Sequence, residues 1–349
     1  MSDTIERTNI AHLAAVAVLP RQKDGWHTDS LPAELVAAAE PAPIVAVLIP
    51  CFNEEASVGQ VVADFQAALP SATVYVYDNN STDRTALAAR AAGAIVRHEG
   101  LQGKGHVVRR MFADIDADAY VLVDGDGTYD ATAAPAMLRL LRDHNLDMVN
   151  AARVPVAKQA YRPGHRFGNA MLTGMVKTVF GNRIGDMLSG YRVFSRRFVK
   201  SFPALATRFE TETEFTVHAL ALHMPVREVL TVYKARPPGS VSKLSTIRDG
   251  IRILRTIVAL IEQERPLQCF ALMALAFAVG GVGLGLPVVA DFLHTGLVPR
   301  LPTAVLATGL MLLSFLSLVC GLVLDSVSRG RKEFKRLAYL AIAAAEARR

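Results

Sequence analysis

The chain has 349 residues, 51% of them hydrophobic and 20% charged, with a formal net charge of +6. This length suffices for one large domain or two ordinary ones, and the modest charge does not by itself indicate a nucleic-acid-binding protein. The three cysteines are scattered and form neither a disulfide framework nor a zinc motif, and the first ten residues lack the features of a signal peptide. The apolar composition favours a soluble domain joined to a membrane segment.

Residues 1–42 are rich in Ala and Pro and show no lasting periodicity, so we expect an N-terminal tail there. From residue 43 to residue 245, apolar strand-like runs alternate with helical stretches. The runs are IVAVLIP, ATVYVYD, AGAIVRH, AYVLVD and LDMVNAAR. This alternation predicts an α/β domain whose mostly parallel sheet carries helices on both faces.

Polar residues collect where three of these strands end, in the motifs PCFNEE, DNNSTD and DGDGTYD. Each motif alone is typical of a turn or a helix cap. Sheets of this kind bind ligands at the carboxyl ends of their strands. Three polar motifs at one edge of the sheet therefore predict a ligand site.

The third motif places Asp124 and Asp126 one residue apart among glycines. Two neighbouring carboxylates repel each other, and no basic residue is adjacent in sequence, so an opposite charge must come from elsewhere. A hard divalent cation such as Mg²⁺ or Mn²⁺ takes oxygen ligands and often binds through one or two carboxylates and substrate phosphates. The spacing therefore predicts a metal–diphosphate site.

Two long segments near the C-terminus lack charged residues, from Pro266 to Ala290 and from Leu301 to Leu324. Each exceeds the roughly 20 residues needed to cross a bilayer core. We expect a transmembrane hairpin over residues 267–325, with two buried helices of a soluble core as the alternative. Gly281 and Gly285 indicate either a close helix–helix contact or simply a stretch of small residues.

Basic residues flank this hairpin on both sides, whereas its linker offers only Arg300. The positive-inside rule then predicts a cytoplasmic catalytic domain and two cytoplasmic termini in a multi-pass protein of the cell inner membrane. Residues 246–266 and the stretch 161–181 mix basic and apolar residues, which favours helices lying in the membrane interface over ordinary packed helices. We expect a basic cytoplasmic tail over residues 326–349.

The motifs VLIPCFNEE, DNNSTD, DGDGTYD and GDMLSGYR, in this order, resemble those of family-2 glycosyltransferases with the GT-A (Rossmann-like) fold. Within that family the chain is similar to polyprenyl-phosphate glycosyltransferases, the group of dolichyl-phosphate mannose synthase and the bacterial undecaprenyl-phosphate enzymes. The resemblance spans about residues 44–244. It implies a metal-dependent (Mg²⁺ or Mn²⁺), inverting transfer of a hexose from a nucleotide sugar to a polyprenyl phosphate. We favour a UDP-sugar over GDP-mannose as the donor.

On the donor side, the resemblance assigns Pro50, Glu54 and Asp78 to the nucleoside, and Asp124 and Asp126 to metal and diphosphate. The family often has Asp-Asp-Gly where this chain has Asp78-Asn79-Asn80. Asparagine tolerates left-handed backbone, so we expect Asn80 to replace the glycine of the turn.

The segment LQGKGHVVRR places Lys104 in a glycine-rich loop ahead of a helix, an arrangement that can bind phosphate. A role on the donor side and a solvated surface lysine are the two interpretations of this residue.

On the reacting side, the resemblance makes Asp186 an acid close to the sugar and Arg192 a basic residue facing the acceptor phosphate. The segment KARPPGSVSKL resembles the family's late basic motif, in which Arg236, Ser242 and Lys243 would also face phosphate.

The segment FETETEF offers a base among Glu210, Glu212 and Glu214, or simply the polar start of a helix. Two other functions are weighed against lipid-phosphate transfer. One is a processive polysaccharide synthase, and the other is a non-catalytic membrane scaffold with a nucleotide-binding fold. The sequence leaves open the sugar, the lipid length, the pathway and whether the chain forms a homo-oligomer.

Overall fold

The structure is a computed structural model that describes residues 43–155, 174, 184–207, 210–237, 254–255, 257–259 and 261–342. These residues belong to one compact unit that begins at Ala42. The predictions for the tail 1–42, for most of the stretch 161–181, for nearly half of the stretch 246–266, and for Ser242 and Lys243 lie outside the described residues.

A seven-stranded sheet forms the centre of the described part, with the strand order β3-β2-β1-β4-β6-β5-β7. The strands are β1 (Val45–Cys51), β2 (Thr73–Asp78), β3 (Ile95–His98), β4 (Ala119–Leu122), β5 (Met148–Pro155), β6 (Arg192–Ser195) and β7 (Val226–Tyr233). Strand β6 runs antiparallel to both its neighbours, and all other pairs are parallel. The prediction of a mostly parallel sheet is confirmed.

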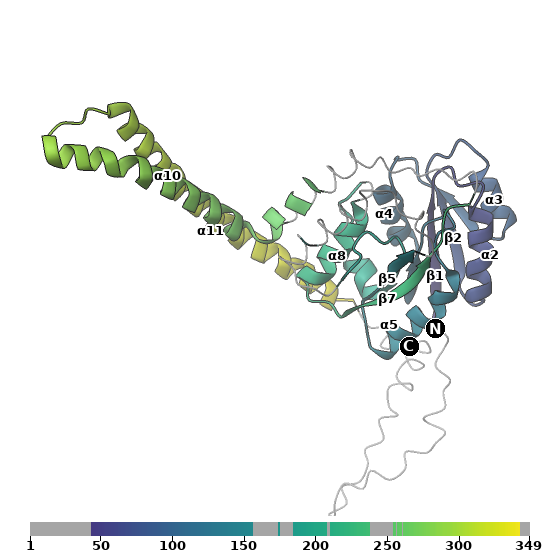
Figure 1. Cartoon of the computed structure of the whole chain (residues 1–349). Coiled ribbons are helices and arrows are strands. Elements are labelled where there is room, and N and C mark those ends of the chain that lie inside the picture. Colours follow the sequence, from purple (N-terminus) through teal and green to yellow (C-terminus); the bar gives the residue numbers. More distant parts are fainter. Residues whose placement is uncertain are drawn as a thin grey trace, which may run out of the picture. The chain divides into compact units, whose positions relative to one another are not determined.

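Helices cover both faces of this sheet. They are α2 (Val58–Ala68), α3 (Thr85–Ala91), α4 (Lys104–Asp114), α5 (Ala134–Asp143), α7 (Arg196–Ser201) and α8 (Thr211–Ala221). Alternate residues of β1 enter different apolar clusters: Leu48 packs with residues of α4 and α8, and Val47 packs with residues of α2 and α5. Figure 1 shows α2 and α3 on one side of β1 and β2, with α4 and α8 on the other. A strand buried on both faces must be apolar throughout, which explains the unbroken run IVAVLIP.

Two long apolar helices follow, α10 (Pro266–Thr295) and α11 (Leu301–Leu340), and they pack against each other as a hairpin. Both are long and apolar enough to cross a membrane, and only 11% and 17% of their most apolar windows are buried. Core helices of a soluble protein would be mostly buried, so that alternative is wrong for these two helices. Their length and exposure suggest membrane association.

Small residues bring α10 and α11 together. A Cβ added at Gly281 would lie 3.0 Å from the sulfur of Met311 and 3.2 Å from the carbonyl oxygen of Ala307. The Ser314 hydroxyl donates a hydrogen bond of 2.8 Å across the interface to the carbonyl of Ala274. The predicted close contact at Gly281 is confirmed.

Helix α11 continues beyond its apolar part as a helical arm, residues 325–340, where we expected a separate tail. The Tyr339 hydroxyl donates to the carboxylate of Asp147 at 2.8 Å, just before β5. The Arg197 guanidinium lies over the Tyr339 ring, 5.8 Å from its centroid. The arm is therefore bound to the end of the sheet at which β5 begins.

Candidate functional site

The carboxyl ends of β1, β2 and β4 lie at one edge of the sheet, because these strands are parallel neighbours in matching register. The loops after β1 and β2 are bound together there. The Asn53 amide donates to the Ser81 hydroxyl at 2.9 Å, and the Glu54 amide donates to the Thr85 hydroxyl at 2.8 Å. Asn80 has a φ of 62°, so the expected left-handed turn is confirmed. The first two polar motifs thus form one surface.

Asp126 lies at this edge and is only 4% exposed. Its carboxylate accepts hydrogen bonds from the hydroxyl and the amide of Thr128, and it pairs with Arg236 at 2.6 Å. Burial, followed by the negative charge of Asp124, raises the pKa of Asp126 above its ordinary value, although Arg236 opposes this shift. The repulsion expected from the sequence is therefore present in the fold.

Asp124 pairs with Lys104, whose ammonium lies 2.5 Å from its carboxylate. The same ammonium also pairs with Glu212 in the first turn of α8. Burial alone would lower the pKa of Lys104, but the carboxylates of Asp124 and Glu212 raise it above its ordinary value. The Lys104 side chain is only 9% exposed, so the interpretation as a solvated surface lysine is wrong.

The metal prediction can be compared with the donor atoms present. The described residues contain no group of three or more His, Cys, Asp or Glu side chains that could hold a metal ion. Mg²⁺ commonly binds proteins through only one or two carboxylates and completes its shell with water and phosphate. Asp124 and Asp126 supply such hard oxygen donors, and Asp126 is nearly fully buried beside the negative charge of Asp124. These two side chains fit a divalent cation.

Asp186 lies in the loop that precedes β6 and is 7% exposed. Arg153, near the end of β5, holds its carboxylate through two bonds of 2.7 and 2.8 Å. The Glu228 carboxylate of β7 accepts hydrogen bonds from the backbone amides of Gly185 and Asp186 at 2.8 and 2.9 Å. The loop is therefore fixed to two neighbouring strands.

The same loop reaches the aspartate pair at Gly190. A Cβ added there would lie 2.2 Å from a carboxylate oxygen of Asp124, so a larger residue would displace that carboxylate. The Gly190 amide donates to the Tyr129 hydroxyl at 2.8 Å. Residues sixty positions apart in sequence are thereby brought into contact, as the motif order suggested.

Arg192 has surroundings that differ from those we expected. Its side chain is fully buried, and it donates to the carbonyls of Met187 and Ser189 and to the Thr216 hydroxyl. The guanidinium lies over the Phe215 ring, and burial lowers its pKa to about 10. Because the guanidinium donates its hydrogen bonds inside the core, Arg192 does not face a lipid phosphate. The prediction that it binds the acceptor phosphate is wrong.

The three glutamates of FETETEF separate in the structure. Glu214 accepts hydrogen bonds from the backbone amides of Leu205 and Ala206 at 2.9 and 2.8 Å, and burial raises its pKa. Its role is to hold the preceding segment. Glu210 precedes the first residue of α8, while Glu212 faces Lys104. Glu212 is thus linked to the aspartate pair through Lys104.

Sequence reasoning missed Arg153, Tyr129 and Glu228. Arg153 ends the run LDMVNAAR, and the position of an ionisable group near the carboxyl end of a strand was the available signal. Tyr129 and Glu228 gave no signal, because each acts on backbone atoms distant in sequence.

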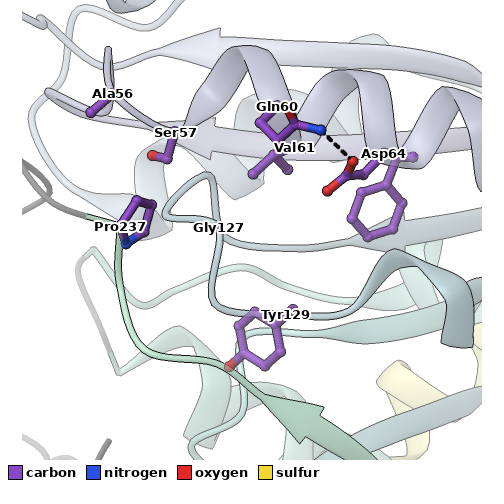
Figure 2. Close-up of a pocket in the computed structure, with 9 residues that line it drawn as sticks. Ala56, Ser57, Gln60, Val61, Asp64, Gly127, Tyr129 and Pro237 are labelled. Atoms are coloured by element: carbon purple, nitrogen blue, oxygen red, sulfur yellow. Dashed lines mark hydrogen bonds between the residues drawn. The ribbon is translucent and has the colours of Figure 1, made fainter.

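A pocket of about 260 Å³ lies on the α2 side of the Gly127 turn. Figure 2 shows Gln60, Val61 and Asp64 of α2 facing Gly127 and Tyr129. The Ser57 hydroxyl, at the same pocket, donates to the carbonyl of Gly125 at 2.7 Å. Asp124, Asp126 and Lys104 are not among its lining residues. The pocket therefore backs the aspartate loop and does not coincide with the candidate metal site.

Comparison with known proteins assigns the family. Residues 46–202 match the model of Glycosyl transferase family 2. Glycosyltransferase AglJ of Haloferax volcanii is 31% identical over 295 residues, which cover 84% of this chain and 97% of the relative. The chain belongs to glycosyl transferase family 2. The chain is also 26% identical over 221 residues to a dolichyl-phosphate hexose transferase of Haloferax volcanii. This match covers 63% of the chain and 95% of the relative.

A solved structure confirms the GT-A fold of the glycosyltransferase. Glucosyl-3-phosphoglycerate synthase of Mycobacterium tuberculosis, in complex with Mn²⁺ and UDP-glucose, superposes with a TM-score of 0.51. The match covers 67% of this chain and 85% of the synthase at 21% identity. The prediction of a family-2 glycosyltransferase with the GT-A fold is thus confirmed.

Proposed function

We propose that this enzyme transfers a hexose, with inversion, from a nucleotide sugar to a polyprenyl phosphate at the cytoplasmic face of a membrane. The observation that carries the proposal is the aspartate pair at the carboxyl edge of the sheet, in contact with the Asp186 loop, in a chain that continues into two membrane-length helices. The similarity to a dolichyl-phosphate hexose transferase supports a lipid-phosphate acceptor. A UDP-sugar is the favoured donor, because the structural neighbour is a complex with UDP-glucose.

The nucleoside would bind beside Pro50, Glu54 and Asp78. Asp78 is 8% exposed, and one of its carboxylate oxygens has no hydrogen-bond partner among the described residues. A buried carboxylate oxygen without a partner is costly, so a donor from the base or the ribose would stabilise it. This feature supports the assignment of Asp78 to the nucleoside.

Asp124 and Asp126 would hold Mg²⁺ or Mn²⁺ against the donor diphosphate. The metal supplies positive charge that neutralises the departing diphosphate. Asp186 would lie beside the sugar, where its negative charge stabilises the positive charge that grows at C1. Its ion pair with Arg153 fixes the orientation of the carboxylate before the substrate binds.

The acceptor phosphate would need little help from a general base, since a phosphate monoester has a second pKa of about 6. Arg236 lies 2.6 Å from Asp126 and 3.8 Å from Glu54, which supports a role at the phosphates. We keep Ser242 and Lys243, which lie outside the described residues, as further phosphate-binding residues.

The membrane arrangement completes the proposal. Residues 43–245 form the catalytic domain, residues 246–266 an interface helix and residues 267–325 the hairpin. Basic residues lie at both ends of the hairpin, which supports cytoplasmic termini.

The test is a panel of nucleotide sugars with membranes, undecaprenyl phosphate and Mn²⁺, with and without EDTA. We expect one donor to give a lipid-linked hexose, and we expect EDTA and Asp126→Asn to abolish the product. Asp130→Asn is the matched control, because Asp130 belongs to the same motif but caps a short helix through the amide of Thr132. Full activity in excess EDTA, or no transfer to lipid phosphate with any donor, would contradict the proposal.

A further inference from the structure

Each carboxylate of the aspartate pair holds a different basic side chain. Asp124 pairs with Lys104, which begins α4, and Asp126 pairs with Arg236, which follows β7. These two basic residues come from elements far apart in sequence. Both carboxylates that would hold a divalent cation are therefore already next to positive charges.

Each basic residue is also shared with a second buried acid. Lys104 pairs with Glu212, which is 5% exposed, and Arg236 lies 3.8 Å from Glu54, which is 7% exposed. Among the residues that the structure describes, four carboxylates of this group thus face two cations, which gives these six side chains a formal charge of −2. One divalent cation would balance that charge.

Lys104 is arranged differently from Arg236. Its ammonium lies between two carboxylates, and the second oxygen of Glu212 has no hydrogen-bond partner among the described residues. Lys104 follows Gly103, whose φ of 137° belongs to glycine alone, so the chain is turned to aim the lysine at the aspartate pair. A compact ammonium on a flexible stem can exchange partners with little rearrangement of the backbone.

We propose that Lys104 is an exchangeable counter-cation of the donor site: it neutralises Asp124 and Glu212 while the site is empty, and it moves to the donor diphosphate when metal and nucleotide bind. The exchange keeps Asp124 next to a positive charge at every stage, first the lysine and then the metal. It also makes binding of metal and binding of nucleotide depend on each other. This inference rests on the proposed metal–diphosphate site. It adds a role for Glu212, which is the second carboxylate that pairs with Lys104 while the site is empty.

The exchange predicts two effects of opposite sign in Lys104→Met. Without nucleotide, Mn²⁺ should bind more tightly, by about tenfold, because a competing positive charge beside Asp124 is gone. With saturating Mn²⁺, UDP should bind more weakly, also by about tenfold, because a charge-assisted hydrogen bond is lost. Free Mn²⁺ is counted by electron paramagnetic resonance, and UDP binding is measured by calorimetry on the full-length protein in detergent.

A second variant separates the exchange from a loss of folding. Glu212→Gln removes the alternative partner of the lysine, so Mn²⁺ alone should bind more weakly than in the unchanged protein. In the Lys104→Met background, Glu212→Gln should change Mn²⁺ affinity little, so the double variant should resemble Lys104→Met, because Glu212 acts on the metal through the lysine. Lys234→Met is the matched control: Lys234 is half-exposed and lies 4.0 Å from Asp130, away from the pair.

The outcomes distinguish this inference from the proposed function. If the unchanged protein binds no Mn²⁺, the metal site itself is wrong. If it binds Mn²⁺ and Lys104→Met leaves both affinities unchanged, or shifts them in the same direction, the exchange is overturned while the metal site stands.

Discussion

Asp186 is held by Arg153 through two short bonds, at 7% exposure. In the proposed reaction its charge matters most when positive charge develops at C1. We expect Asp186→Asn to lower turnover by about 10²-fold, in the range typical of removing one electrostatic stabiliser. Donor affinity should stay nearly intact, because the interaction is made mainly in the transition state. Turnover and UDP binding are measured on the same preparation, and near-normal turnover would leave Asp186 a structural residue.

Arg192 is a buried side chain that binds the Asp186 loop to α8, and its loss should be a stability effect. Arg192→Met keeps an apolar stem but leaves the carbonyls of Met187 and Ser189 without their donors. We expect the free energy of unfolding to fall by about 3 kcal/mol, since each unsatisfied buried group costs about 1–3 kcal/mol. Thermal unfolding in detergent measures the change.

Arg196 provides the control for that experiment. Its side chain is partly exposed and pairs at 2.9 Å with Asp116, which is 44% exposed, and ion pairs in contact with solvent contribute about 0–1 kcal/mol. Arg196→Met should shift the midpoint little. Equal shifts in the two variants would mean that the buried hydrogen bonds of Arg192 contribute no more than a surface pair.

At the scale of residues, the sequence predicted the aspartate pair because two adjacent carboxylates demand a counter-charge wherever they lie. It could not predict which cation meets them, since Lys104 and Arg236 arrive through the fold. Arg192 was misassigned for a related reason. The sequence alone does not show whether a basic residue beside a functional motif is exposed to a phosphate or buried in the core, as Arg192 is.

Among the elements, the hairpin offers the sharpest test. Gly281 lies where an added Cβ would meet Met311 and Ala307 at 3.0–3.2 Å, whereas Gly283 has nothing within 4 Å. We expect Gly281→Ile to separate α10 from α11 and to lower the thermal stability of the detergent-solubilised protein, while Gly283→Ile changes it little. Disulfide cross-linking between cysteines placed on the two helices reports the separation. Equal cross-linking yields in both variants would contradict the close contact.

Strands β1 to β5 were predictable at this scale because each lies in an apolar run that alternates with a helical stretch. Strand β7 was not predictable, because Arg227 and Glu228 interrupt the apolar residues of VREVLTVY. The antiparallel strand β6 was not, since its four residues follow a motif that we assigned to the site. The helical arm beyond residue 325 was also missed. Its many basic residues resemble a solvated tail, and only contacts such as Tyr339 with Asp147 show that it binds the domain.

For the whole molecule, the charge pattern predicts the topology. Both flanks of the hairpin are basic, so the linker 296–300 should lie on the opposite side of the membrane from both termini. A cysteine introduced at Leu297 should react with an impermeant reagent from outside the cell. A reporter that is active only in the cytoplasm should be active when it is fused to the C-terminus. Activity of a C-terminal reporter that works only in the periplasm would show that the chain does not form a hairpin with this orientation.

The helical arm of α11 also constrains how many residues can separate the membrane-spanning part of the helix from Tyr339. The helix has 40 residues, about 60 Å at 1.5 Å per residue, of which a bilayer core takes only about 30 Å. Because an α-helix has 3.6 residues per turn, one residue inserted in the arm would rotate Tyr339 by about 100° away from Asp147. Seven inserted residues would nearly restore its direction but displace it by about 10 Å. Only insertions close to a whole number of helical turns keep Tyr339 pointing in its present direction, and these change the distance between the membrane and the sheet. Substitutions in the arm should therefore be tolerated more easily than changes in its length.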